Sequence, residues 1–249
     1  MFKVMQFFLD MDGRTEALRM IHKRLRDHFV GFPPRYVILD PVSQLVMSML
    51  GGHTYSHVSK AAHADLVRNY RNWSDVRAAP VRDIEYIIRN VTYAEVKASR
   101  LVRALALISD ESGHPSLDHL AAMSVEAAHD WLERLPGVGP KTAAAVLNTS
   151  YLQKRSLVID THHLRILERL QIVRPNTSIA QAYSQVMPLL PSDWSAHIMD
   201  VHHMLFKKLG QVICRVHIAH CEDCPLNQLC PYPDKSDEGK ATLAMITSH

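Results

Sequence analysis

The sequence predicts an all-α protein, and two observations lead to this fold class. Apolar side chains recur at the three- and four-residue spacing of a helix along most of the chain, as Leu18, Ile21, Leu25 and Phe29 do in the first such segment. Runs of alternating β-branched residues are scarce, and the best strand candidate covers only residues 156–159. We therefore expect about ten helices and very little sheet.

Capping and stop signals place these helices in order along the chain. Gly31-Phe-Pro-Pro34 ends the first one, and Asp40 followed by Pro41 is suited to begin the second. Ser74, as an N-cap, and Pro80 open two short helices. The other predicted helices follow from their apolar stripes and cover residues 57–70, 95–108, 125–135, 141–148, 161–172, 179–189 and 195–209.

Composition limits the classes of protein that the chain can belong to. It has 249 residues, of which 47% are hydrophobic, so it can bury a core as one large domain or two smaller ones. The net charge of +3 permits a nucleic-acid partner without requiring one. No segment reaches the roughly 18 uninterrupted apolar residues of a membrane span. The apolar N-terminal run is followed at once by Asp10 and Asp12, which argues against a secretory signal. We expect a soluble, cytoplasmic protein with no membrane association.

The strongest local signal is the string Leu135-Pro-Gly-Val-Gly-Pro-Lys-Thr-Ala143, which lies between two predicted helices. Gly137 and Gly139 can adopt positive φ and expose backbone amides, while Val138 can point inward and hold the turn. Pro140 suits the first position of the next helix. Amides gathered at a helix N-terminus favour an anion such as a phosphate of nucleic acid. The alternative is a connector between two helices in which the glycines only shape the turn.

Lys141, within this string, and Asp160, which follows it, each have a structural and a chemical interpretation. Lys141 lies in the first turn of the predicted helix, where the positive end of the helix dipole favours the neutral, nucleophilic amine. The alternative for Lys141 is a solvated side chain that makes one phosphate contact. Asp160, in Val158-Ile-Asp-Thr-His-His-Leu-Arg165, is suited to cap a helix that starts at Thr161. Capping fixes a carboxylate in place, so a structural and a catalytic role are compatible.

All four cysteines of the chain lie close together, at Cys214, Cys221, Cys224 and Cys230. Four thiolates at this spacing are enough to hold one metal centre. Two disulfides are disfavoured by an intracellular setting. A zinc site and a 4Fe-4S cluster both remain open from spacing, although zinc ligands are usually paired more closely on both sides.

Together these motifs resemble the endonuclease III family of DNA glycosylases. The string at 135–143 resembles the family's helix–hairpin–helix, the segment 158–165 resembles its Val-Asp-Thr-His segment, and the cysteine spacing matches its Cys-x6-Cys-x2-Cys-x5-Cys pattern. The resemblance implies that Lys141 attacks the sugar and forms a Schiff base, with Asp160 assisting departure of the base. It implies a structural 4Fe-4S cluster on the four cysteines. It also implies DNA contacts from the hairpin residues Gly137, Val138, Gly139 and Thr142, and from Arg215 in the loop between the first two cysteines.

The sequence departs from the family pattern at two positions that concern recognition of the lesion. His53 stands where the family has a glutamine that fills the gap left by an extruded nucleotide. Histidine can donate a hydrogen bond or stack in that gap, or it can be an ordinary residue at a helix end. Tyr93 stands at the position of a wedging leucine, in a loop that lacks the family's glycine. The histidine pairs at 162–163 and 202–203 are assigned no metal-binding or catalytic role, because adjacent residues diverge on a helix.

The resemblance implies a fold of two lobes. A six-helix domain is expected at residues 35–153, and a cluster domain is expected to combine residues 1–34 with 154–234. A groove between them is expected to hold duplex DNA, with Lys141 and Asp160 facing each other at its mouth. Residues 235–249 are expected to form a disordered tail.

The implied function is base-excision repair by a bifunctional DNA glycosylase and AP lyase. We expect a monomer that acts on double-stranded DNA with damaged bases or abasic sites, with oxidised pyrimidines as substrates. In a bacterium it would be associated with the nucleoid. The alternatives are a monofunctional mismatch or adenine glycosylase, whose members generally lack lysine at the Lys141 position, and a DNA-binding relative without catalysis. A zinc-binding helical protein is a third alternative.

Overall fold

The structure, a computed structural model, describes residues 11–33, 37–109 and 113–232. Within these residues the regular elements are helices and no strand is formed, so the all-α prediction is confirmed. The chain divides into two compact units. One comprises residues 37–156, and the other combines the described residues before 37 with those from 157 onward. The expected domains at 35–153 and at 1–34 with 154–234 stay predictions, and the expected tail at 235–249 lies outside the described residues.

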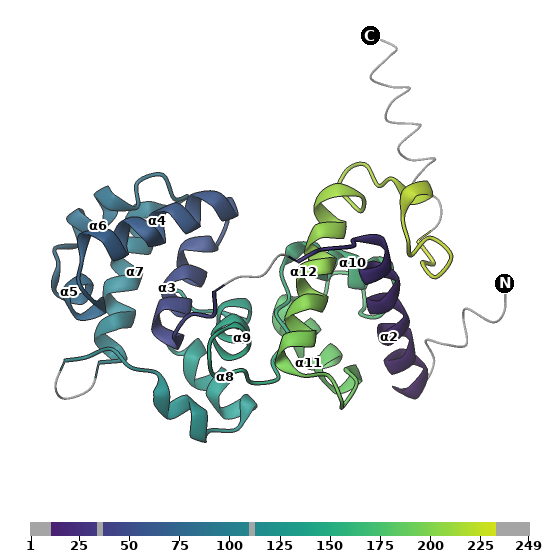
Figure 1. Cartoon of the computed structure of the whole chain (residues 1–249), viewed down its shortest axis with the longest axis horizontal. Coiled ribbons are helices and arrows are strands. Elements are labelled where there is room, and N and C mark those ends of the chain that lie inside the picture. Colours follow the sequence, from purple (N-terminus) through teal and green to yellow (C-terminus); the bar gives the residue numbers. More distant parts are fainter. Residues whose placement is uncertain (1–10, 34–36, 110–112, 233–249) are drawn as a thin grey trace, which may run out of the picture. The chain divides into compact units, whose positions relative to one another are not determined.

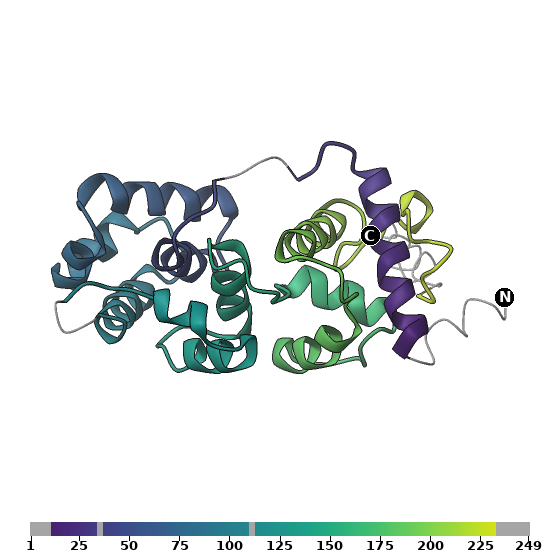
Figure 2. The same ribbon diagram turned by 60° about the horizontal axis from the view of Figure 1, so that its bottom comes forward.

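The unit at residues 37–156 is built around α3 (Figure 1). Its core includes Leu45, Val46 and Leu50 of α3, and this helix packs against α4, α7 and α9 (Figure 2). The elements of this unit are α3 (Pro41–Gly51), α4 (Ser56–Asn69), α5 (Trp73–Ala78), α6 (Val81–Ile87), α7 (Ala94–Leu107), η1 (Asp118–Ala122), α8 (Val125–Glu133) and α9 (Pro140–Thr149).

Local start signals explain most of these boundaries. The Asp40 carboxylate accepts a hydrogen bond from the Ser43 amide at 2.9 Å, and Pro41 is the first helical residue of α3, as predicted. The prediction that Ser74 caps α5 is wrong. The cap is Asn72, whose extended backbone lets its side chain accept from the Asp75 amide at 3.0 Å. Ser74 therefore lies inside the helix.

The other unit is built from α2 (Met11–His28), α10 (Thr161–Arg169), α11 (Ile179–Val186), η2 (Met187–Leu189), α12 (Ala196–Val212) and η3 (Cys221–Asp223). The strand proposed for residues 156–159 is not formed. These residues are buried and form no regular element, and Leu157 and Ile159 belong to the apolar core of this unit. Their apolar pattern reflects burial of a connecting segment, because no neighbouring strand pairs with it.

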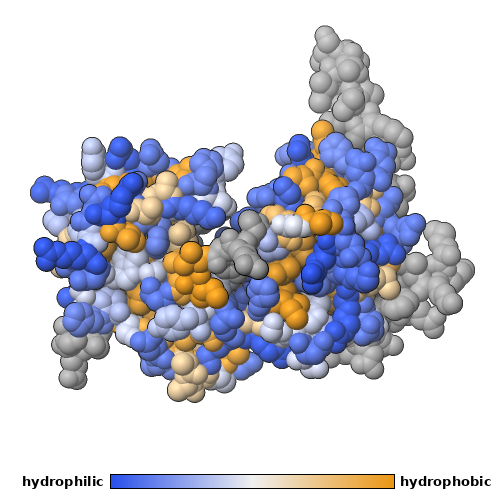
Figure 3. Space-filling view, in the orientation of Figure 1, coloured by the Kyte–Doolittle hydropathy of each residue, from blue (hydrophilic) through white to orange (hydrophobic). Residues whose placement is uncertain are grey.

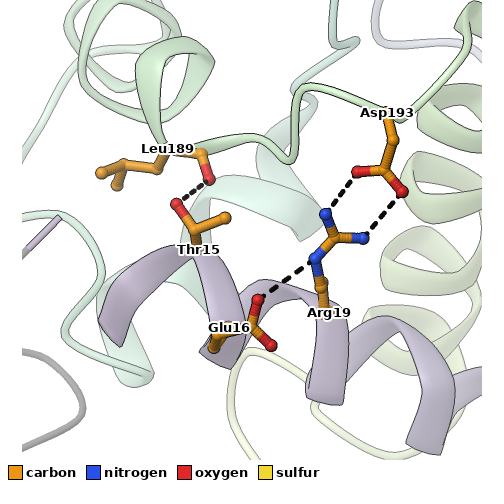
Figure 4. Close-up of polar contacts among 5 residues, drawn as sticks. All are labelled: Thr15, Glu16, Arg19, Leu189 and Asp193. Carbon is orange, nitrogen blue, oxygen red and sulfur yellow. Dashed lines mark hydrogen bonds and ion pairs between the residues drawn. The ribbon is translucent and has the colours of Figure 1, made fainter. Parts of the chain in front are cut away.

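Polar contacts join α2 to chain segments far along the sequence (Figure 4). The Thr15 hydroxyl donates to the Leu189 carbonyl at 2.9 Å. Arg19 forms a two-pronged ion pair with Asp193, and its Nε lies 3.3 Å from Glu16 on the same helix. Leu18, Ile21 and Leu25 of α2 are fully buried in the core. Helix α2 therefore belongs to the unit that contains Asp160 and the cysteines.

The surface of each unit is mainly polar, as expected when the apolar side chains form the cores. In the view of Figure 3 both units are mainly hydrophilic, with smaller apolar areas between the charged ones. Within the described part of the chain, no helix is both long enough and apolar enough to cross a membrane.

Candidate functional site

The hairpin between α8 and α9 is held by its central apolar residue. Val138 is 8% exposed and lies in the core with Leu135, and its amide donates to the Leu135 carbonyl at 3.1 Å. Pro140 is the first residue of α9, with Gly139 as the N-cap. The inward position of Val138 and the place of Pro140 are as predicted. In the described structure no side chain caps the start of α9.

The two hairpin glycines have different conformations. Gly137 has φ of 83°, and a Cβ there would lie 2.9 Å from Cδ of Arg100 and 3.4 Å from Cε of Met49. Gly139 is extended, with φ of −120°, and a Cβ there would meet nothing within 4 Å. The prediction of positive φ is therefore correct for Gly137 and wrong for Gly139. The hairpin's own packing does not require glycine at position 139, and the space in front of it is open.

Lys141 and Thr142 follow in the first turn of α9, and both are partly buried. A second lysine, Lys97 of α7, lies near Lys141. Burial and the charge of Lys141 lower the pKa of Lys97 to about 8. Sequence reasoning missed this neighbour because the two lysines are far apart along the chain.

The structure brings His53 and Tyr93 together on the unit at residues 37–156. Their ring centroids are 6.3 Å apart and the rings meet edge to face at 83°. Both residues are exposed and both have left-handed backbone, with φ of 53° and 60°. The loops that carry them are joined because the Thr92 amide donates to the Thr54 hydroxyl at 3.2 Å. A left-handed backbone at residues other than glycine is strained, and such strain concentrates at functional sites.

Asp160 is the N-cap of α10, as predicted, and accepts a hydrogen bond from the His163 amide at 2.9 Å. It is 6% exposed. Burial opposes ionisation, but His203, the His163 amide and Lys207 outweigh it and lower the pKa of Asp160 to about 2. The side chain is therefore a carboxylate at neutral pH, fixed in place by α10 and α12.

A chain of aromatic contacts among buried histidines lies beside Asp160. His163 stacks on His203 with centroids 5.8 Å apart, and its ring lies 5.6 Å from His202. Nδ1 of His202 lies 3.3 Å from Nδ1 of His22 on α2. Burial lowers the pKa of His163 to about 3 and that of His202 well below its usual value. The rings of His163 and His202 are therefore neutral packing groups at neutral pH.

The two pairs of adjacent histidines differ in burial. In the pair 162–163, His163 is buried and His162 is half-buried. In the pair 202–203, both rings are buried. Other rings cover both histidines of α12: Phe206 packs against His202, and His163 packs against His202 and His203.

The four cysteines line one pocket together with Asn227 and Tyr232. All four are free cysteines, so the pair of disulfides considered as an alternative to a metal centre is not formed. Burial raises the pKa of Cys224 to about 11 and that of Cys230 to about 12. Within the residues that the structure describes, no group of three or more His, Cys, Asp or Glu side chains is close enough to hold a metal ion. The sulfurs therefore share a pocket without converging on one point.

Two arginines of α10 hold the first cysteine and the loop after it. Arg165 donates to the carbonyls of Gly210 and Cys214 at 2.9 and 2.8 Å. Arg169 donates to Sγ of Cys214 at 3.0 Å and to the Arg215 carbonyl at 2.8 Å. The helix capped by Asp160 is thereby tied to the cysteine segment. The Arg215 side chain is exposed, and its Nε donates to the Gln211 carbonyl at 3.2 Å.

The predicted site residues fall into the two units. The hairpin, Lys141, His53 and Tyr93 belong to the unit at residues 37–156, whereas Asp160, Arg215 and the cysteines belong to the other. The expectation that Lys141 and Asp160 face each other across a groove stays a prediction.

Comparison with known proteins defines the class of this fold. A model of the helix-hairpin-helix motif matches residues 124–149. The non-covalent complex of an endonuclease III with DNA superimposes with a TM-score of 0.73 over 90% of this chain and 98% of that one, at 23% identity. The fold is therefore that of the helix–hairpin–helix DNA glycosylases.

Sequence comparison agrees. The chain is 28% identical to endonuclease III of Bacillus subtilis over 70% of this chain and 73% of the relative. It is 27% identical to endonuclease III of Thermotoga maritima over 89% of this chain and 97% of the relative. The predicted resemblance to endonuclease III is confirmed.

Proposed function

We propose that the protein is a bifunctional DNA glycosylase and AP lyase of base-excision repair. The observation that carries the proposal is the place of Lys141, which follows the hairpin in the first turn of α9, a helix whose N-terminus has no capping side chain in the described structure. A nucleophilic amine next to a phosphate-binding turn is what attack on a DNA sugar requires. Endonuclease III and a glycosylase/lyase of Clostridium acetobutylicum, both similar in fold, support this assignment.

The hairpin is proposed to hold the backbone of double-stranded DNA. The open space in front of Gly139 allows a phosphate to approach the amides at the start of α9. Val138 fixes the turn from inside, and Thr142 lies one residue beyond Lys141. Such contacts bind DNA without reading its sequence. Arg215 adds an exposed cation on the other unit. The small net charge of +3 makes these local contacts more important than the overall field.

Lys141 and Asp160 are proposed to carry the chemistry. The neutral amine of Lys141 attacks the anomeric carbon, and the glycosidic bond breaks as the base leaves with the bonding electrons and takes up a proton. Loss of an amine proton and opening of the sugar ring give a Schiff base. Removal of a proton from the neighbouring sugar carbon then expels the 3′ phosphate, which nicks the strand. Asp160 is ionised at neutral pH and can stabilise positive charge on the sugar.

His53 and Tyr93 are proposed to act when the damaged nucleotide leaves the stack. Their exposed, adjoining rings supply one group to fill the gap and one to wedge against the opposite strand. Base–aromatic stacking stabilises such contacts by about 1–3 kcal/mol for each base. We propose oxidised pyrimidines as the substrate class, by resemblance to endonuclease III.

The pocket of Cys214, Cys221, Cys224 and Cys230 is proposed to hold a 4Fe-4S cluster. The donor set fits, because four half-buried thiols face one pocket and Arg169 donates to the first sulfur. Burial raises the pKa of Cys224 and Cys230, and positive iron beside these sulfurs would favour their thiolate forms. The four cysteines would hold the cluster, and iron–sulfur bonds would then fasten the cysteine segment.

Assays on defined oligonucleotides test the proposal. Wild-type protein should release damaged pyrimidines and nick abasic DNA on the 3′ side, whereas Lys141→Gln should do neither and still bind the DNA. Base release without nicking would instead show the monofunctional alternative. Binding without either reaction would show a DNA-binding relative that lacks catalysis.

A further inference from the structure

The start of α4 carries a pair of exposed, stacked rings. Tyr55 is 80% exposed, and His57 is also exposed. Their ring centroids are 5.9 Å apart and their planes differ by 20°, which is the geometry of an offset-stacked pair. Single exposed aromatic side chains are common on protein surfaces, but two rings held nearly parallel form a flat apolar platform that a planar ligand can cover.

Tyr55 stands where a helix normally has a short polar residue. It is the N-cap of α4 and gives no capping hydrogen bond. Its backbone would suit a serine, because the cap Ser124 of α8 has φ of −63° and ψ of 161°, against −59° and 140° for Tyr55. Serine at a cap stabilises a helix and tyrosine does not. A residue that gives up such local stability indicates a functional position.

The turn that leads to Tyr55 is held in one conformation by a buried cation. Nζ of Lys97 donates to the Leu50 carbonyl at 2.8 Å, to the Gly52 carbonyl and to the Thr54 hydroxyl at 3.1 Å. Three acceptors use all three protons of an ammonium group. The turn is therefore ordered before any ligand binds, and little conformational entropy is lost when its rings make a contact.

This turn is joined to the loop proposed to wedge the DNA. We call the turn at residues 52–55 and the loop at residues 88–93 the recognition loops. The Thr54 hydroxyl of the first loop accepts from the Thr92 amide of the second at 3.2 Å. Tyr55 follows Thr54 directly, so the platform begins at the point where the two loops are tied together.

The platform is close to the residue proposed to fill the gap left by the damaged nucleotide. Tyr55 is two residues after His53, so their Cα atoms are at most about 7.6 Å apart. This span is about two base steps of roughly 3.4 Å each. When a nucleotide leaves the stack, the base opposite to it has no pairing partner. A base in that state can stack on an aromatic side chain of the protein.

We propose that Tyr55, stacked on His57, is a specificity-determining residue that binds the unpaired base opposite the lesion. This inference rests on the proposed function and on the place given there to His53. A nucleobase is the occupant that fits, because it presents a flat π-face of the kind that stacks on exposed aromatic rings. Purines have larger faces than pyrimidines, so an opposite purine is bound more tightly.

Binding to duplexes that contain tetrahydrofuran, a stable analogue of an abasic site, tests the proposal. Tetrahydrofuran has no aldehyde and forms no Schiff base, so the affinity is measured without reaction. Three duplexes carry adenine, thymine or a second tetrahydrofuran opposite the first. We expect wild-type protein to bind the duplex with adenine about tenfold more tightly than the duplex without an opposite base, with thymine between the two.

Variants of Tyr55 separate the ring from the fold. Tyr55→Ser and Tyr55→Asn should lose the tenfold gain and keep the wild-type affinity for the duplex without an opposite base. Both residues are favoured N-caps, so thermal unfolding should occur at the wild-type temperature or above it. Tyr55→Phe keeps the ring and should keep the gain. Tyr86→Ser removes an exposed tyrosine from α6 of the same unit and should also keep the gain.

Two kinds of negative result have different meanings. If folded Tyr55→Ser keeps the wild-type gain, or if Tyr86→Ser loses the gain as well, Tyr55 does not bind the opposite base and this inference is wrong. Nicking of natural abasic sites by these variants and by wild-type protein tests the proposed function separately. If wild-type protein does not nick such sites, the proposed function fails, and the role of Tyr55 fails with it.

Discussion

At the scale of single residues, Asp160 combines a structural and a proposed chemical role. Its carboxylate caps α10 and is buried, yet its pKa is about 2. Because the folded-state pKa lies below the unfolded one, the charge stabilises the fold above about pH 4 and the effect is lost as the pH falls toward 2.

Replacing Asp160 with asparagine tests this charge. Asparagine caps a helix as well as aspartate does, so the variant isolates the charge. We expect Asp160→Asn to lower the free energy of unfolding by about 1–2 kcal/mol at neutral pH. Urea titrations should show a smaller difference between variant and wild type at pH 3. A difference that is constant with pH would contradict the assigned origin of the pKa shift.

The two hairpin glycines form a matched pair for mutation. Gly137→Ala places a Cβ 2.9 Å from Arg100 at positive φ, so we expect a loss of about 1–3 kcal/mol in stability. Gly139→Ala meets nothing and should change stability by no more than about 0.5 kcal/mol. It should nevertheless weaken binding of abasic DNA about tenfold, because the Cβ blocks a phosphate. Thermal unfolding and fluorescence anisotropy measure the two effects, and unchanged binding by Gly139→Ala would contradict the proposed backbone contact.

Sequence reasoning works for residues whose role is set by their immediate neighbours. The cap at Asp160, the buried Val138 and the start of α9 at Pro140 follow from a few adjacent residues. The left-handed backbone of His53 and Tyr93 is imposed by surrounding structure, since neither residue type prefers it. Lys97 was missed because its acceptors lie more than forty residues earlier in the chain.

At the scale of elements, periodicity predicts helices well because each amphipathic segment buries one face against the same core. The errors occur where tertiary contacts determine the local backbone structure. Residues 156–159 carry a strand-like pattern, but they form a buried connection that no other strand pairs with. The start of α5 depends on whether Asn72 or Ser74 has the extended backbone of a cap, which the sequence alone does not determine.

The attachment of α2 can be tested on the helix itself. Thr15→Val removes the donor to the Leu189 carbonyl, and we expect a loss of about 0.5–1.5 kcal/mol in the free energy of unfolding. Lys23→Ala removes an exposed ion pair with Asp27 on the same helix and should have almost no effect. Urea unfolding compares the two variants. Equal effects would show that α2 is held by its apolar face alone.

At the scale of the whole molecule, the described chain combines two units that carry different parts of the proposed site. The hairpin unit supplies Lys141 and the recognition loops, and the other unit supplies Asp160 and the cysteines. The fold class and the resemblance to endonuclease III could be predicted from motifs, because the hairpin string and the cysteine spacing are specific. How Lys141 and Asp160 approach each other depends on the arrangement of two units, which no local pattern encodes.

Metal analysis of the purified chain tests the cysteine pocket. We expect a brown protein with about four irons per chain and a broad visible absorbance band. Cys221→Ser should lose both the colour and the resistance of the segment 214–230 to proteolysis, because the cluster fastens it. Ser184→Ala, on an exposed part of α11, is the matched control and should keep both. A colourless protein with one zinc would contradict the assignment of the cluster.

The central claim is that the Lys141 amine becomes covalently bonded to the DNA sugar. Borohydride reduces a Schiff base to a stable amine, so it traps the protein on abasic or lesion-containing DNA. The wild-type chain should form a cross-linked species that migrates slowly on a denaturing gel, and Lys141→Gln should form none, although it still binds the same DNA. Equal trapping of wild type and Lys141→Gln would contradict the assignment of Lys141 as the nucleophile.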